Sequence, residues 1–169
     1  GRAFEAVALE PGRPTRTGWW NSIEAADVNQ DGRMDYIVGN VGLNTPYRAS
    51  PSEPIRLYYG DFDESGQNQI LEAYYENGRL LPRRNFAMLA SAMPFVRPLF
   101  PTAADFGRAA LEDIFPLDRA VAFSANELAS GIFLNEGGGH FTFRELPRLA
   151  QSAPVFGVAA RDFDGDGFV

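Results

Sequence analysis

Oxygen-bearing side chains recur at alternate positions in one short acidic stretch, DVNQDGRMD. Positions one, three, five and nine are Asp27, Asn29, Asp31 and Asp35, and position six is a glycine. Calcium prefers six to eight oxygen ligands in flexible geometry, supplied by carboxylates, amides and backbone carbonyls. Alternate residues of such a loop point inward, and glycine adopts the backbone angle of a sharp turn. The stretch therefore predicts a loop that holds Ca²⁺.

Position seven of this loop is Arg33, which would offer its backbone carbonyl while its side chain faces water. Asp35 would close the ligand shell, with both carboxylate oxygens. A helix–loop–helix calcium site instead needs a bidentate Glu at position twelve, where this chain has Val38 inside an apolar run. Because the flanking residues are β-branched or aromatic, we expect the loop to join two strands.

A second loop of the same type follows 34 residues later, as the difference between positions 61 and 27 gives. Its donors at positions one, three, five, seven and nine are Asp61, Asp63, Ser65, Gln67 and Gln69. Position twelve is Glu72, which matches the helix–loop–helix spacing and is a possible outer contributor, although the flanks are again strand-like. With fewer carboxylates, this site is expected to bind calcium more weakly than the first.

A third loop has Asp162, Asp164 and Asp166 at positions one, three and five. Its ninth position would be residue 170, so we expect the chain to be cut from a longer protein inside this loop. The competing interpretation of all three loops is a set of solvated turns, since Asp, Asn and Gly favour turns for local hydrogen-bonding reasons. Three copies with the same flanking pattern favour metal sites.

Composition excludes several other functions. The net charge of −7 disfavours binding to the nucleic-acid backbone. Cysteine is absent, so neither a disulfide framework nor a thiolate metal site can form. No apolar run approaches the ~20 residues of a membrane span. The single histidine, His140, is expected to be a turn residue, and no nucleophile elbow, HExxH or phosphate-binding glycine loop is present.

The arrangement of apolar runs predicts an all-β chain. Strands are expected at 4–9, on either side of the first two acidic loops and at 156–160, before the third. Asn77-Gly78 favours a tight hairpin, and 131–146 is expected to form a second hairpin around three glycines. Residues 83–116 are rich in Ala, Met and Leu and predict a helical insertion. Thr102 is the expected cap of a helix carrying the apolar stripe Phe106, Ala109, Ala110 and Phe115.

These motifs resemble the FG-GAP/VCBS-repeat family of calcium-binding β-propellers, and especially its ASPIC/UnbV-like bacterial branch. The resemblance rests on four stretches that span most of the chain: GWWNSIEAADVNQDGRMDYIVGNVGLN, LYYGDFDESG, GIFLNEGGGHFTFRELP and APVFGVAARDFDGDG. It implies antiparallel four-stranded blades with calcium in the loop between two strands. Residues 1–169 would then form one partial propeller domain, because two to three blades cannot close a ring of 4–8.

The resemblance further implies an extracellular, periplasmic or cell-surface bacterial protein that binds or adheres to a protein or glycan ligand. The alternative is a calcium-dependent carbohydrate-active enzyme, such as a polysaccharide lyase or hydrolase, and a subunit of a bacterial complex is a third possibility. We expect no enzyme, because no catalytic constellation is visible. Trp19 and Trp20 could stack on a sugar, although such a pair more often divides between the core and its edge.

Overall fold

The computed structural model describes residues 10, 12 and 15–169, and the strand expected at 4–9 lies outside them. The chain forms two compact units. The first comprises the described residues up to Pro46 together with Glu127–Val169, and the second is Tyr47–Asn126. Each unit is built on one four-stranded antiparallel sheet. The described helices are all too short or too polar to cross a lipid bilayer.

The sheet of the first unit is a simple antiparallel meander. Its strands, in spatial order, are β1 (Ser22–Ala26), β2 (Asp35–Gly39), β7 (Gly131–Gly137) and β8 (His140–Glu145). The whole second unit is inserted in the sequence between β2 and β7. Val38 and Phe133 are buried on the same face, because side chains two residues apart share a face and Tyr36 pairs with Phe133.

The sheet of the second unit has a different connectivity. Its strands, in spatial order, are β5 (Arg79–Pro82), β4 (Gln69–Glu76), β3 (Ile55–Gly60) and β6 (Val121–Ala125). The first three strands follow one another as hairpins, and β6 returns to pair with β3 after the helical segment. The fold is therefore mostly β, as the sequence predicts, and the described residues form no closed ring of sheets.

Both predicted hairpins are confirmed. Asn77 and Gly78 connect β4 to β5 with φ of 53° and 74°, the positive angles that a tight primed turn requires. In the first unit, β7 pairs with β8 around the expected glycines, with a register shift between Asn135 and Gly137. Strands also flank the first two acidic loops, where β1 pairs with β2 and β3 with β4.

Short helices occupy the segment where an insertion was expected. They are α1 (Phe86–Ala92), α2 (Ala103–Arg108) and α3 (Leu111–Ile114), with the 3₁₀ turn η1 (Pro94–Leu99). A second 3₁₀ turn, η2 (Leu117–Arg119), follows just after this segment, and a third, η3 (Arg148–Gln151), belongs to the first unit. Thr102 caps α2 as predicted, since its hydroxyl accepts the Asp105 N–H at 3.1 Å. The single apolar stripe is wrong, because the chain leaves the helix at Ala109 with ψ of 145°.

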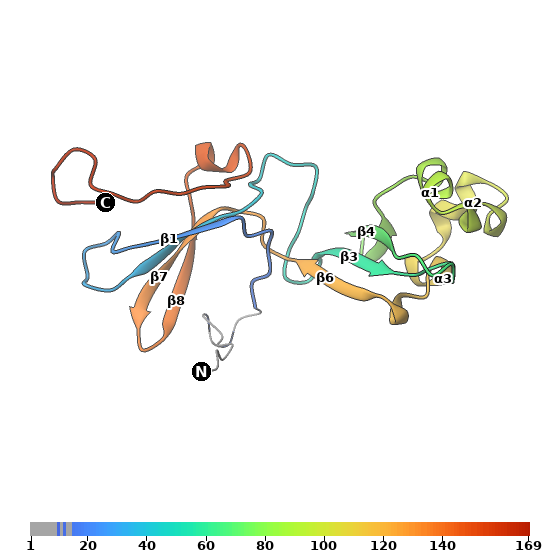
Figure 1. Ribbon diagram of the computed structural model, residues 1–169, viewed down its shortest axis with the longest axis horizontal. Helices are drawn as coiled ribbons and strands as arrows, with labels where there is room; N and C mark the ends of the chain where they lie inside the picture. The colour runs from blue at the N-terminus through green and yellow to red at the C-terminus, as the bar shows by residue number, and fades with distance from the viewer. Residues whose placement is uncertain (1–9, 11, 13–14) are drawn as a thin grey trace. The chain divides into compact units, whose positions relative to one another are not determined.

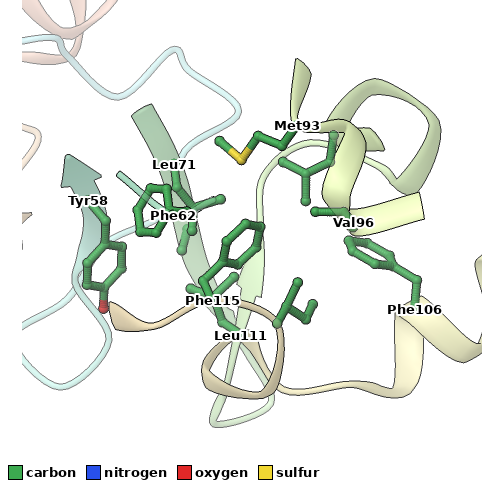
Figure 2. Packing of buried hydrophobic residues seen from close by; sticks show 11 residues of the cluster. Tyr58, Phe62, Leu71, Met93, Val96, Phe106, Leu111 and Phe115 are labelled. Carbon is green, nitrogen blue, oxygen red and sulfur yellow. The ribbon is translucent and has the colours of Figure 1, made fainter. Parts of the chain in front are cut away.

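In the second unit the helices lie beside the sheet (Figure 1), and buried side chains from both form one hydrophobic core (Figure 2). Its fully buried side chains include Leu71, Leu89, Val96, Leu111 and Phe115. Burial of each such side chain contributes about 1.5–3 kcal/mol. Phe62, in the loop between β3 and β4, is buried in this core and anchors the loop to it.

The strand expected at 156–160 is wrong. These residues form no strand, and Phe156 is 75% exposed. Just before them, the Val155 N–H donates to the Asn40 carbonyl at 2.9 Å, and the Val155 carbonyl accepts the Ser22 hydroxyl at 3.2 Å. A strand requires a continuous ladder with a neighbour, and the sequence pattern alone does not supply that neighbour.

Candidate metal centre

The first acidic loop, between β1 and β2, is closed by its own side chains. The carboxylate of Asp27 accepts the N–H of Asp31 at 3.0 Å and that of Gly32 at 2.8 Å. The side-chain oxygen of Asn29 accepts the Asp31 N–H at 3.2 Å, and Asp31 accepts the N–H of Arg33 at 2.9 Å. Side chains at positions one, three and five therefore turn inward over the backbone of the loop.

The second loop, between β3 and β4, repeats this pattern at the same positions. Asp61 accepts the N–H of Ser65 at 3.0 Å and that of Gly66 at 2.7 Å. Asp63 accepts the Ser65 N–H at 3.2 Å, and the Ser65 hydroxyl accepts the Gln67 N–H at 3.3 Å. The replacement of an aspartate by Ser65 at position five thus keeps the turn but removes one negative charge.

The third loop follows no strand and shares most of this closure, but Asp162 accepts the N–H of position four, Gly165, at 2.6 Å instead of that of position five. Asp162 accepts the Gly167 N–H at 2.9 Å, Asp164 accepts the Asp166 N–H at 3.3 Å, and Asp166 accepts the Phe168 N–H at 2.8 Å. These bonds join residues at most five apart. The loop conformation is therefore set by local sequence, independently of the sheets.

Positive φ angles at positions four and six explain why the three loops share one shape. Position four has φ of 59° at Gln30, 57° at Glu64 and 79° at Gly165. Position six is glycine in each loop, with φ between 81° and 87°. Because this left-handed region is unfavourable for residues with a Cβ, the glycine at position six relieves strain in each turn.

Asp35, at position nine of the first loop, is fully buried. One of its carboxylate oxygens accepts the Val28 N–H at 3.1 Å, and the other accepts the Asn135 N–H of β7 at 2.8 Å. Asp35, the predicted bidentate ligand at the start of β2, therefore also links the first loop to β7. Each carboxylate oxygen keeps a lone pair after accepting one N–H, so a role in cation binding remains a prediction.

Gln69 occupies the corresponding position in the second loop. Its side-chain oxygen accepts the Phe62 N–H at 2.9 Å, just as Asp35 accepts that of Val28. Its amide nitrogen donates to Asp63 at 2.9 Å. An N–H donor directed at the acidic side chains opposes a cation there, which is the physical reason to expect weaker binding in this loop.

The sequence predicts that the side chain of Arg33 faces water. In the structure it is exposed but also makes two hydrogen bonds. Its guanidinium donates to Asp31 and to the backbone carbonyl of Asn135 at 2.6 Å. A cation bound by Asp31 therefore competes with this ion pair. Sequence reasoning also missed Asn135, whose side chain donates to the Met34 carbonyl at 3.1 Å; its place in the FLNEGGGHF hairpin is the only signal for it.

The third loop holds the tightest acidic group. Among the described residues, the carboxylates of Asp162, Asp164 and Asp166 form the one group of three acidic side chains with ligand atoms within 4.8 Å of one another. All three are exposed, and exposed acidic groups are common without an ion. Hydrogen bonds from the backbone N–H groups of Gly167 and Gly165 lower the pKa of Asp162.

In the second loop, the pKa of Asp63 is lowered by the Ser65 side chain first and by Gln69 next. In both loops the donors stabilise the carboxylate form, so these aspartates carry their charge at neutral pH. Repulsion among neighbouring carboxylates remains, and a divalent ion would relieve it. All the candidate metal ligands in the three loops are oxygen atoms, which are the ligands that Ca²⁺ and Mg²⁺ prefer, so these residues fit a hard cation.

The first and third loops are in contact. The side-chain amide of Gln30 donates to the Gly167 carbonyl at 2.8 Å. The two residues are at positions four and six of their loops. The structure thus places two of the three predicted cation loops beside each other in the first unit, which their separation in the sequence did not indicate.

A cavity of about 430 Å³ lies on the sheet of the first unit, lined by Arg16, Trp20, Asn21, Ser22, Ile23, Tyr36, Val38 and Phe133. Trp20 is 36% exposed and contacts Phe133 edge-on, with ring centroids 6.2 Å apart. His140 was expected in the turn but is the first residue of β8, directly after the turn and paired with Gly137, and its side chain is exposed.

Comparison with known protein families, with curated proteins and with solved structures found no match for the chain.

Proposed function

We propose that this chain is a calcium-binding module of the FG-GAP/VCBS type, with ions that rigidify the loops of propeller blades. The proposal rests chiefly on the three acidic loops, which share one backbone shape and one pattern of side-chain to backbone hydrogen bonds. In two of them the loop joins neighbouring antiparallel strands. The four-stranded meander of the first unit supports the blade interpretation.

Calcium would act by stabilising the folded loops. An ion bound to Asp27, Asn29, Asp31 and Asp35 would neutralise carboxylates that are held close together, and it would bind the unfolded chain far less well. In the first loop the ion displaces the guanidinium of Arg33 from Asp31. The expected gain in stability follows the ratio of calcium concentration to dissociation constant.

The proposed setting is outside the cytoplasm, at a bacterial cell surface or in the periplasm. Extracellular calcium-binding modules typically have dissociation constants of about 10⁻⁴–10⁻³ M, and this location is also what the resemblance to the FG-GAP/VCBS family implies. The proposed ligand is a protein or a glycan, and the aromatic cavity beside Trp20 and Tyr36 is where a sugar ring could stack. A glycan array probed with the wild-type chain and with Trp20→Ala tests this part separately.

Calorimetric titration of the chelator-treated chain with Ca²⁺ tests the central proposal. We expect heat of binding and a higher melting temperature with calcium, and a larger loss of affinity in Asp31→Ala than in Gln69→Ala. Asp118→Asn is the matched control, because it removes one exposed carboxylate that lies outside all three loops. Equal melting temperatures with and without chelator would refute a structural ion.

A further inference from the structure

The hairpin turn between β4 and β5 contains the only Asn-Gly pair in the chain, Asn77-Gly78. Both residues are exposed, and a Cβ built on Gly78 would meet nothing within 4 Å. The strand ladder ends at the flanking pair Glu76 and Arg79. No side-chain hydrogen bond to Asn77 is present among the described contacts, so its amide group is free to rotate.

We propose that Asn77 is a site of spontaneous deamidation. The backbone nitrogen of Gly78 attacks the side-chain carbon Cγ of Asn77, so that an N–Cγ bond forms and the Cγ–Nδ2 bond breaks. The proton lost from the Gly78 nitrogen passes through solvent to the departing Nδ2 group, which leaves as ammonia. The resulting five-membered succinimide is opened by water at either carbonyl, giving aspartate or isoaspartate. No electrons are transferred, and solvent water is the only co-reactant. Gly78 favours the attack because it has no Cβ to obstruct the approach.

Two of the three Asp-Gly pairs in the acidic loops provide an internal contrast. Asp31 precedes Gly32, but its carboxylate accepts the Arg33 N–H at 2.9 Å and is paired with the Arg33 guanidinium. Asp166 precedes Gly167 and accepts the Phe168 N–H at 2.8 Å. These bonds restrain the orientation of each carboxylate, whereas no such bond to the Asn77 side chain is present among the described residues.

The modification would disturb the edge of the second sheet. Isoaspartate adds one carbon to the main chain of a two-residue turn and places a negative charge beside Glu76, so the pairing of β4 with β5 cannot be kept unchanged. Arg79, directly after the turn, donates to the Arg108 carbonyl at 2.8 Å, and Leu80 packs against the hydrophobic core. We therefore expect the modified hairpin to lose protection at β5.

Incubation of the folded chain in mildly alkaline buffer, followed by tryptic mapping, tests the proposal. Trypsin releases residues 57–79 as one peptide, which also contains the exposed Asn68 followed by glutamine as an internal control. We expect a gain of one mass unit and an isoaspartate at Asn77, none at Asn68, and complete loss of the signal in Asn77→Gln.

The same incubation in urea separates chemistry from conformation. If the unfolded chain deamidates at Asn77 while the folded chain stays unmodified, the turn protects the site and the proposal is overturned. Far-UV circular dichroism shows whether Asn77→Gln remains folded. Should that variant unfold, the comparison of Asn77 with Asn68 inside the wild-type peptide still decides the outcome, because both residues belong to the same molecule.

Discussion

Replacement of Asp35 by alanine is the sharpest test of how the first loop is attached to its sheet. The substitution removes the acceptor for two backbone N–H groups, one from Val28 at 3.1 Å and one from Asn135 at 2.8 Å. Each N–H left unsatisfied costs about 1–3 kcal/mol, and bonds to a charged acceptor lie toward the upper end. We therefore expect a loss of about 2–5 kcal/mol in the free energy of unfolding of the first unit.

Tryptophan fluorescence during urea unfolding reports this loss selectively. The chain has two tryptophans, Trp19 and Trp20, and both belong to the first unit. Measurements in chelator isolate the hydrogen bonds from any bound ion. Asp35→Asn, which keeps one carbonyl acceptor, should lose less stability than Asp35→Ala.

Gln69→Ala is the matched control in the second loop. It removes a neutral acceptor for one backbone N–H, that of Phe62, so the expected cost to the second unit is about 1 kcal/mol.

A loss below about 1 kcal/mol for Asp35→Ala would refute the reasoning, because two unsatisfied N–H groups cannot cost so little unless water replaces the carboxylate.

Three further changes test the loops and the core. Phe62→Ala should destabilise the second unit by about 3–5 kcal/mol, because the Phe62 side chain is only 5% exposed. Phe163→Ala, at the same position of the third loop, should have little effect on stability, because Phe163 is 82% exposed. Far-UV circular dichroism in urea measures both. Thr102→Ala should cost about 1 kcal/mol through loss of the helix cap, measured by the same unfolding series. In calcium-free protein, carboxyl NMR titration should place the pKa of Asp162 below 3.8. The hydrogen bonds to its carboxylate therefore add to the free energy of unfolding at pH values above 3.8, and this contribution is lost as the pH falls through the lowered pKa of the folded state.

Phe62 and Phe163 show why equivalent motifs have different surroundings. Both follow the first aspartate of an acidic loop. Phe62 contacts Phe115, with ring centroids 5.3 Å apart, and belongs to the hydrophobic cluster, in which it lies beside Leu71 (Figure 2). Nothing comparable covers Phe163 among the described residues. Burial depends on helices that arise elsewhere in the chain, so the loop motif cannot specify it.

The sequence by itself determined the local features of this protein. The three acidic turns, the Asn77-Gly78 hairpin and the Thr102 cap are held by hydrogen bonds between residues at most a few positions apart, or by the backbone angles of single residues. Such preferences depend on residue type and spacing, which a sequence displays directly. The three loops were predictable for this reason.

Only the tertiary structure decided what these local features attach to. The pairing of β2 with β7 and of β3 with β6 joins segments that are far apart in the chain, and no short pattern encodes which strands become neighbours. The same holds for the contact of Gln30 with Gly167 and for the burial of Asp35 against β7. These contacts form only when the whole unit packs, because their free energy comes from burial and from ladders shared between distant segments.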